Sequence, residues 1–226
     1  MIWDDKGFLV SKNKYNENSL IVEIFTKIHG KTPGIIFGGT SKKIKNYLQL
    51  GNLLHISYQS KTEDKLGYFK IEILNAFSPL FFNNHHKLLC ISSAMQLIKI
   101  LTADSQKNLK VYELIHKFYD ILKSNYWIKE YIFWELELLS ILGYNLDLRN
   151  FVEKDIINGQ TKYKIKSSKE TRFIPGFLMD NNLGNPDNDS LLQGLKLVGD
   201  YLEKNILKPN NINFNLNRSE FVNALK

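Results

Sequence analysis

A lysine-rich segment from Gly38 to Tyr47 carries the residue types that are suited to recognising phosphate. Lysine occupies three of the four positions 42–45 (Lys42, Lys43 and Lys45), two glycines come before them, and the segment contains no acidic residue. Phosphate recognition needs mobile cations and accessible backbone N–H groups, and a glycine-led basic loop supplies both. We therefore predict a DNA-binding loop here. An ordinary solvated loop remains the alternative, because surface lysines are common.

The positive charge is concentrated in the N-terminal third of the chain. The whole chain has 30 lysines and arginines against 23 acidic residues, a formal charge of +7. Residues 1–80 contain eleven lysines, no arginine and seven acidic residues, a net charge of +4. Lysine lacks the bidentate fork that reads guanine, so we expect DNA binding without sequence preference and with strong salt dependence. Lys12, Lys14 and Lys31 lie in or beside neighbouring turns and are predicted to extend this surface.

Two tyrosines are candidates for stacking on unpaired bases. Every base has a flat face, so stacking on an aromatic ring adds affinity for single strands without sequence preference. Tyr68 falls on the outer face of its predicted strand, and we include it in the predicted DNA-binding site. Tyr58 lies in the predicted strand 54–59, where it shares one face with Leu54 and Ile56, so we predict that it points into the core.

A second basic strip lies further along the chain. Lys162, Lys164 and Lys166 alternate with Tyr163 and Ile165, which predicts a hairpin with its lysines on one face. The lysines are either a secondary DNA contact or the charged side chains that protect an exposed strand edge from aggregation. Both interpretations stay open.

Other clusters of polar residues offer little chemistry. His85 and His86 are adjacent and project in different directions, so with Cys90 nearby we expect buried or capping roles rather than a metal site. The segment from Asp180 to Asp189 is rich in Asp and Asn but lacks the glycine and the terminal glutamate of a calcium-binding loop. We expect no metal site.

No set of catalytic residues is found in the sequence. Glu135 and Glu137 are two positions apart on a predicted helix, so their carboxylates face apart. The chain has no phosphate-binding GxxxxGK[ST] motif, no nucleophile elbow, and no H-x-E motif with paired cysteines. We predict that the chain is not an enzyme.

The first eighty residues read as short strands. Runs of β-branched and aromatic residues, or alternation of apolar and polar residues, mark each strand, and no convincing helix separates them. Five such strands fit a small closed barrel, most economically an OB-fold. The predicted strands span residues 7–10, 19–26, 34–37, 54–59 and 68–73.

After Ser78-Pro79 the apolar period changes from two to about 3.6, which predicts helices. The expected fold class is α+β in two domains, an OB-fold over residues 1–79 and a mainly helical domain over 80–226. The helical domain contains an irregular excursion at about 147–186, and Gly143 is expected to cap the helix before it. The predicted helices span residues 88–101, 109–122, 127–142 and 191–207, with a short one from Ser219.

The composition bounds the compartment. Cys90 is the only cysteine, so the chain cannot form an internal disulfide or an all-thiolate zinc site. No apolar run reaches the roughly 18 residues that span a bilayer, and the first residues do not resemble a signal peptide. We expect a protein of the reducing cytoplasm, associated with the nucleoid, and no membrane partner.

Several short motifs, taken in order along the chain, resemble the bacterial recombination mediator family RecO. Their order and spacing carry the resemblance, which covers nearly the whole chain. The motifs are Gly7-Phe8-Leu9-Val10, Glu17-Asn18-Ser19-Leu20-Ile21, Phe25-Thr26, His29-Gly30-Lys31, Gly38 to Lys45, Leu66-Gly67, Trp134 to Leu139, Leu142-Gly143-Tyr144, Leu146-Asp147-Leu148 and Gly199 to Leu202.

The resemblance implies a binding protein with an N-terminal OB-fold and a helical domain. It implies binding to single- and double-stranded DNA, annealing of complementary strands, and work with RecR and RecF to load RecA onto strands coated by single-stranded DNA-binding protein. It also implies a groove for the acidic, apolar C-terminal tail of that coating protein. Many relatives hold zinc with four cysteines after the segment that matches Gly143-Tyr144. Residues 147–177 contain no cysteine here, so we expect no zinc and no other cofactor.

Two alternatives of different classes stay open. In the first, the chain is a protein–protein adaptor whose helices are the working surface and whose basic barrel is not a DNA site. In the second, it is a fragment of a nuclease or ligase, which would need a cluster of carboxylates that the sequence does not reveal.

Overall fold

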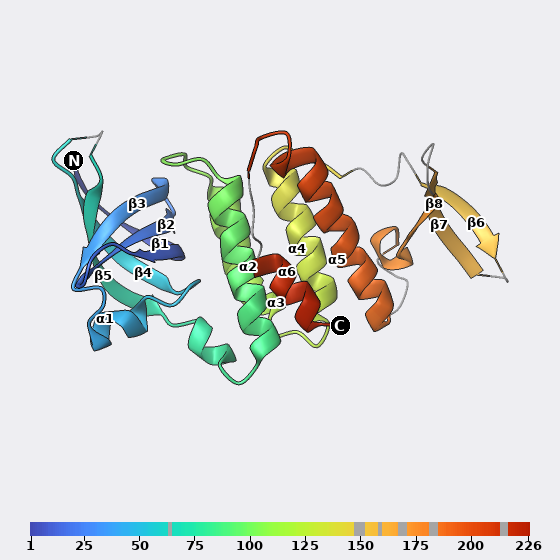
Figure 1. Cartoon of the computed structure of the whole chain (residues 1–226), viewed down its shortest axis with the longest axis horizontal. Coiled ribbons are helices and arrows are strands. Elements are labelled where there is room, and N and C mark those ends of the chain that lie inside the picture. Colours follow the sequence, from blue (N-terminus) through green and yellow to red (C-terminus); the bar gives the residue numbers. More distant parts are fainter. Residues whose placement is uncertain (63–64, 147–151, 158–159, 167–170, 181–184, 213–216) are drawn as a thin grey trace. The chain divides into compact units, whose positions relative to one another are not determined.

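The computed structural model of the chain describes residues 1–62, 65–146, 152–157, 160–166, 171–180, 185–212 and 217–226 (Figure 1). The chain divides into two compact units. The first contains residues 1–119 and 216–224, and the second contains residues 120–215 and 225–226. Within the described ranges, no helix is long and apolar enough to cross a membrane.

The first unit begins with a closed β-barrel. The strand order is β1-β2-β3-β5-β4, and β4 pairs in turn with β1. Neighbouring strands are antiparallel except for β3 and β5, which are parallel. The closed barrel confirms the predicted OB-fold and the α+β class. The strands are β1 (Ile2–Lys14), β2 (Ser19–Thr26), β3 (Gly30–Phe37), β4 (Leu53–Gln59) and β5 (Gly67–Asn75).

Strand β1 is much longer than the apolar run that predicted it. The first half of β1 pairs with β4 and the second half pairs with β2. A shift of register between Leu9 and Ser11 accompanies its pairing with β2. Polar residues occupy much of both ends of the strand, where side chains are largely exposed. A search for apolar runs therefore finds only the central part, where the side chains are buried.

The barrel core is formed by inward-facing side chains of all five strands and by Leu48, which lies between β3 and β4. Alternation along β4 places Leu54, Ile56 and Tyr58 inside, which confirms the core position predicted for Tyr58. The Tyr58 hydroxyl accepts a hydrogen bond from the Gly67 N–H at 3.1 Å. The buried cluster consists of Leu9, Val22, Ile24, Ile36, Leu48, Leu54, Ile56, Tyr58 and Phe69.

Helices complete the first unit. The 3₁₀ turn η1 (Ser78–Phe81) leads into α2 (His85–Leu101), which the Asn84 side chain caps by accepting from the Lys87 N–H. Helix α2 packs against β1 and against α6 (Asn217–Ala224). Helix α3 (Leu109–Ile121) presents Tyr112 and Tyr119 to the ring of Phe8. These helices match the predicted ones closely.

The second unit pairs two helices with a small sheet. Helix α4 (Trp127–Ile141) packs against α5 (Asn188–Leu202), which continues into the π-helical turn η3 (Glu203–Leu207). The sequence predicted one continuous helix over this last stretch. Strands β6 (Glu153–Ile157), β7 (Gln160–Lys166) and β8 (Thr171–Ile174) form an antiparallel sheet, followed by η2 (Gly176–Leu178). The hairpin predicted around Lys162, Lys164 and Lys166 lies in this sheet, where β7 carries these lysines and pairs with both β6 and β8.

Gly143 ends α4 as predicted. Its φ of 87° is left-handed, and its N–H donates to the Ser140 carbonyl at 3.0 Å. The Tyr144 N–H donates to the Leu139 carbonyl at 2.8 Å. This pair of bonds is a Schellman motif, which satisfies carbonyls that a helix end leaves open.

The predicted division at residue 79 follows the end of the barrel, since β5 ends at Asn75. The first compact unit continues beyond it through α2 and most of α3, because these helices bury their apolar side chains against the barrel. The division by fold type is therefore distinct from the division into compact units, and it stays a prediction.

Candidate nucleic-acid interface

The lysine-rich segment contains a short helix, so the prediction of a loop is wrong. Gly38 adopts a left-handed conformation with φ of 69°, and its carbonyl accepts from the Ser41 N–H at 3.0 Å. Helix α1 (Lys42–Tyr47) follows at one end of the barrel (Figure 1). Ile44 packs against the barrel core, and Leu48, four residues later, is fully buried. This spacing favours a helical turn anchored on the core.

The lysines of α1 remain on the surface. Lys42, Lys43 and Lys45 are all exposed. None of the three forms an ion pair with another residue that the structure describes. Their charges are therefore available to an anionic partner, as the predicted DNA-binding site requires.

A surface pocket brings three of the predicted DNA-binding lysines together. Its volume is about 270 Å³. Lys12 and Lys14 reach it from the end of β1, and Lys45 reaches it from α1. We call it the basic pocket; it is lined by Lys12, Asn13, Lys14, Leu20, Gly39, Thr40, Lys45 and Leu48. None of these lining residues is acidic.

The surroundings of Lys12 in the basic pocket disfavour its charged form. The Lys12 ammonium donates to the Leu48 carbonyl at 2.6 Å, which draws it against the barrel. Burial lowers the pKa of Lys12, and the nearby charge of Lys45 lowers it further. An anion bound in the pocket would offset both effects, since a nearby negative charge favours the charged form of Lys12.

The prediction that Lys31 belongs to the DNA-binding surface is wrong. Only 7% of the residue is exposed. Its ammonium donates to the carbonyls of Lys99 and Thr102, at the C-terminal end of α2, and forms an ion pair with Asp104 at 3.2 Å. A cation at this end of a helix meets open carbonyls and a favourable dipole. Lys31 therefore joins the barrel to α2, and its ammonium is not available at the surface.

Tyr68 lies on the outer face of the barrel, as predicted, and it has a neighbour that the sequence reasoning missed. The Tyr68 hydroxyl donates to the side-chain oxygen of Gln59. The Phe37 ring lies 5.9 Å from the Tyr68 ring at an angle of 53°, and Phe37 is 64% exposed. The alternation of side chains along β3 could have predicted the exposed Phe37, because Ile36 points inward and the next residue must then point outward.

The second basic strip lies on β7. Tyr163 is buried with Ile174, in agreement with the predicted alternation. Lys164 forms an ion pair with Asp155 at 2.5 Å, and this hydrogen bond raises the pKa of Lys164. Its charge is thus partly compensated within the sheet. The side chains of Lys162 and Lys166 lie outside the residues whose side chains the structure describes.

The predicted buried or capping role of His85 and His86 is wrong, because both residues are exposed and the side chain that caps α2 belongs to Asn84. The rings of His85 and His86 are 6.3 Å apart and tilted, and Cys90 is buried. Glu135 is buried whereas Glu137 is exposed, so the two carboxylates do face apart. No group of three or more metal-ligating side chains occurs among the described residues. Asp187 caps α5, while residues 181–184 of the predicted Asp-rich loop lie outside the described ranges.

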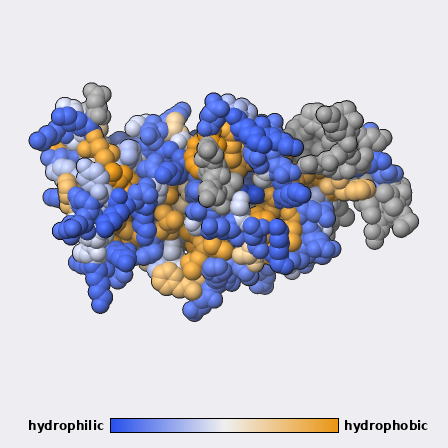
Figure 2. Space-filling view, viewed as in Figure 1, coloured by the Kyte–Doolittle hydropathy of each residue, from blue (hydrophilic) through white to orange (hydrophobic). Residues whose placement is uncertain are grey.

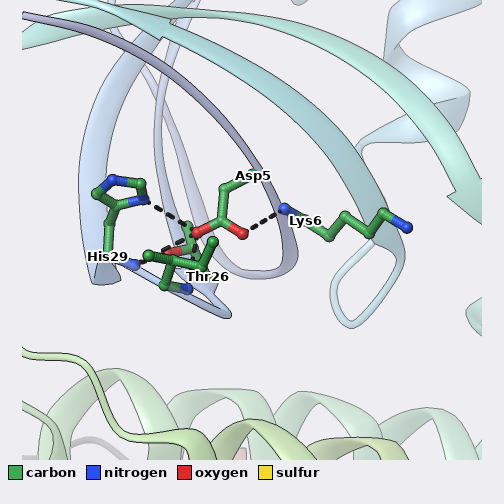
Figure 3. Close-up of polar contacts among 5 residues, drawn as sticks. Asp5, Lys6, Thr26 and His29 are labelled. Atoms are coloured by element: carbon green, nitrogen blue, oxygen red, sulfur yellow. Dashed lines mark hydrogen bonds and ion pairs between the residues drawn. The ribbon is translucent and has the colours of Figure 1, made fainter.

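A buried carboxylate organises the turn between β2 and β3 (Figure 3). Asp5 Oδ2 accepts from the Ile28 N–H at 2.8 Å and lies 3.0 Å from His29 Nδ1, and its Oδ1 accepts from the Lys6 N–H at 2.7 Å. The His29 ring stacks on Trp3 with centroids 3.9 Å apart. Burial opposes the charge of Asp5 most strongly, yet its hydrogen bonds together lower its pKa. The cluster therefore ties the turn to β1, because the Ile28 and His29 N–H groups belong to the turn and the Lys6 N–H belongs to β1.

Comparisons with known proteins point to one protein family along most of the chain. Residues 1–77 match the family model described as Recombination protein O N terminal, and residues 83–211 match Recombination protein O C terminal. A DNA repair protein RecO of Wolbachia pipientis subsp. Culex pipiens (strain wPip) is 33% identical over 66% of this chain and 61% of its own length. That of Wolbachia sp. subsp. Drosophila simulans (strain wRi) is 29% identical over 95% of this chain and 96% of its own. That of Rickettsia conorii (strain ATCC VR-613 / Malish 7) is 30% identical over 79% of this chain and 80% of its own.

Proposed function

This chain belongs to the recombination protein O (RecO) family, and we propose that it works as a binding protein that holds single- and double-stranded DNA without sequence preference. Membership of the family gives it a role in DNA repair and recombination. The observation that carries the proposal is the basic pocket, where lysines from β1 and α1 gather with no acidic lining residue. Lysine offers charge without base recognition, which suits a partner of any sequence.

The proposed activity is the annealing of complementary strands. Two strands repel each other through their phosphates, and cations on a protein surface reduce this repulsion so that the strands approach and pair. Exposed Lys42 and Lys43 on α1 lie beside the basic pocket in sequence and extend its positive surface. No covalent step is needed, so we propose that the chain has no catalytic activity.

The proposed partners follow from the family. We propose that the chain acts with RecR, and with RecF, to help load RecA onto single strands coated by single-stranded DNA-binding protein. The acidic, apolar C-terminal tail of the coating protein is the proposed contact outside the barrel. The family supports this part of the proposal, and the lysine pattern of the barrel is compatible with it.

Charge reversal on α1 tests the proposed site. We expect the variant with Lys42, Lys43 and Lys45 all changed to Glu to lose about tenfold or more of its affinity for single strands, and to anneal slowly, since each phosphate contact contributes. The readouts are fluorescence anisotropy and a fluorescence-quenching annealing assay. The matched control changes Lys107, Lys110 and Lys117 to Glu, which alters the net charge equally near α3, where these lysines are exposed.

The control separates local contacts from overall charge. Equal losses in both variants would mean that net charge alone drives binding. Unchanged binding and annealing in the α1 variant would reject the site and favour the alternative in which the chain is a protein–protein adaptor.

We also propose that the chain needs no zinc. It has a single cysteine, Cys90, which is buried in α2. Four thiolates, the zinc set expected in many relatives, therefore cannot be assembled. Elemental analysis of the purified protein should find less than one equivalent of zinc, and a chelator should leave its thermal unfolding unchanged. A stoichiometric zinc content would overturn this.

A further inference from the structure

An exposed pair of aromatic rings lies on the outer face of the barrel. Phe37, at the end of β3, is 64% exposed, and its ring lies 5.9 Å from that of Tyr68 on β5. The Tyr68 hydroxyl donates to Gln59 on β4, which fixes the orientation of the Tyr68 ring. A ring that is held in place loses little freedom when a ligand stacks against the pair.

The aromatic pair is continuous with the basic pocket. Phe37 is two residues before Gly39, which lines the pocket, so the two positions are at most about 7 Å apart along the chain. Phe37 also pairs across the sheet with Ser19, the neighbour of the lining residue Leu20. The face of the barrel seen in Figure 2 is mostly hydrophilic, with small separate hydrophobic patches. A nucleotide would fit an exposed phenylalanine close to lysines, because its base is flat and its phosphate is charged.

Lys70 adds a cation beside the pair. It is two residues after Tyr68 on β5, so both side chains lie on the outer face of the strand, and Lys70 is exposed. Tyr68 therefore has a cation two residues away on its own strand, and Phe37 lies two residues before Gly39, which lines the basic pocket with Lys12, Lys14 and Lys45. Alternating rings and cations are the pattern that binds a single strand, since bases stack while phosphates meet ammonium groups.

We propose that Phe37, supported by Tyr68, stacks on an unpaired base and gives the chain a preference for single-stranded over double-stranded DNA. The bases of a duplex are stacked on each other and cannot lie on a protein ring, whereas both forms of DNA present phosphates to the lysines. The inference rests on the proposed function, because the strand must first be held by the basic pocket. The lysines then set the affinity for any DNA, and the aromatic pair sets the choice between its forms.

Three DNA probes of equal length test the proposal on the full chain: an oligothymidylate, an abasic strand and a duplex. Changing Phe37 to Ala should weaken binding of the oligothymidylate roughly 5- to 150-fold, as loss of one stacked base does. Binding of the abasic strand and the duplex should stay within about twofold of the wild type. Changing Phe37 to Leu should give most of the same loss, because leucine is apolar but has no π face. Changing the exposed Phe82 to Ala is the matched control and should leave all three unchanged.

The outcomes separate this inference from the proposed function. If the α1 lysine variant weakens all three probes while the Phe37 variant leaves the oligothymidylate unaffected, the proposed function stands and the stacking role is wrong. Equal loss on the abasic strand would also overturn stacking, since no base is present there. If the lysine variant binds all three normally, the proposed DNA site itself fails.

Discussion

Lys12 and Lys31 show how differently one residue type is used on the same barrel. Both were predicted to contact DNA from positions near turns. Lys12 lines the basic pocket, where its ammonium keeps one protein partner, the Leu48 carbonyl. The Lys31 ammonium is occupied by two carbonyls and a carboxylate. Substituting the two residues should therefore affect different properties, DNA binding for Lys12 and stability for Lys31.

Changing Lys31 to Met should lower the free energy of unfolding without weakening DNA binding by the folded protein. Methionine fills a similar volume but leaves the Lys99 and Thr102 carbonyls without their donor, which costs about 1–3 kcal/mol for buried groups. Urea unfolding measures the loss, and anisotropy at low urea measures affinity. A stable variant that binds DNA weakly would restore Lys31 to the DNA site.

Asp5 should make stability depend on acid. Its pKa in the folded protein lies below the ordinary value of 3.8, so the stability it contributes is present above that pH and is lost as pH falls through the lowered value. Changing Asp5 to Asn replaces one acceptor with an amide donor and leaves a backbone N–H unpaired. We expect a loss of about 1–3 kcal/mol at pH 7 and a smaller change in stability between neutral and acid pH. Equal stability of both proteins at pH 7 would contradict this account.

At the scale of elements, the junction between barrel and α3 depends on a glycine. Gly51, just before β4, has φ of 80°, and its carbonyl accepts from the Tyr119 hydroxyl at 2.6 Å. A Cβ atom at this position would lie 2.0 Å from the hydroxyl oxygen. Burial raises the pKa of Tyr119, which keeps the hydroxyl protonated as a donor. Backbone conformation and helix packing are thus coupled at one residue.

Changing Gly51 to Ala should destabilise the first unit by more than the roughly 1–2 kcal/mol cost of a left-handed alanine, because the Tyr119 ring must also move. Changing Tyr119 to Phe is the control. It removes only the hydrogen bond to Gly51 and should cost about 1 kcal/mol. Thermal unfolding of the two variants gives the comparison, and an alanine variant as stable as the phenylalanine variant would show that the close approach does not matter.

At the scale of the whole molecule, the salt dependence of the proposed DNA binding should report how many lysines touch the strand. Each phosphate neutralised on a single strand adds about 0.7 to the slope of log affinity against log salt concentration. The described lysines of α1 and the basic pocket lie together, whereas the remaining charge is spread over the chain. At about 0.1 M salt, charges more than roughly 10 Å from the DNA are screened. The slope therefore reports the lysines in contact rather than the total of +7.

The variant with Lys42, Lys43 and Lys45 changed to Glu should lower this slope by about 2 if all three contact phosphates. Affinity for an oligothymidylate measured at a series of salt concentrations gives the slope. The variant changed at Lys107, Lys110 and Lys117 should keep the wild-type slope. An unchanged slope in the first variant would show that the α1 lysines do not touch the strand.

The sequence by itself determined the elements and the placement of charge along the chain. Apolar periods of two and 3.6 predicted the barrel strands and the helices, and Gly143 marked the end of α4. These signals are local, since a strand or helix pattern is complete within a few residues. The pattern failed for α1 and for the ends of β1, where few apolar residues mark the element.

Only the tertiary structure decided which side chains meet. Lys12 and Lys45 line one pocket because β1 and α1 meet at one end of the barrel, and Phe37 meets Tyr68 because β3 pairs with β5. Lys31 lost its predicted role because α2 ends beside it and offers carbonyls that its ammonium satisfies. Burial and partnership depend on pairings between distant segments, and no local pattern of residues records them. The sequence therefore predicted a basic barrel, and the fold determined which of its lysines can face DNA.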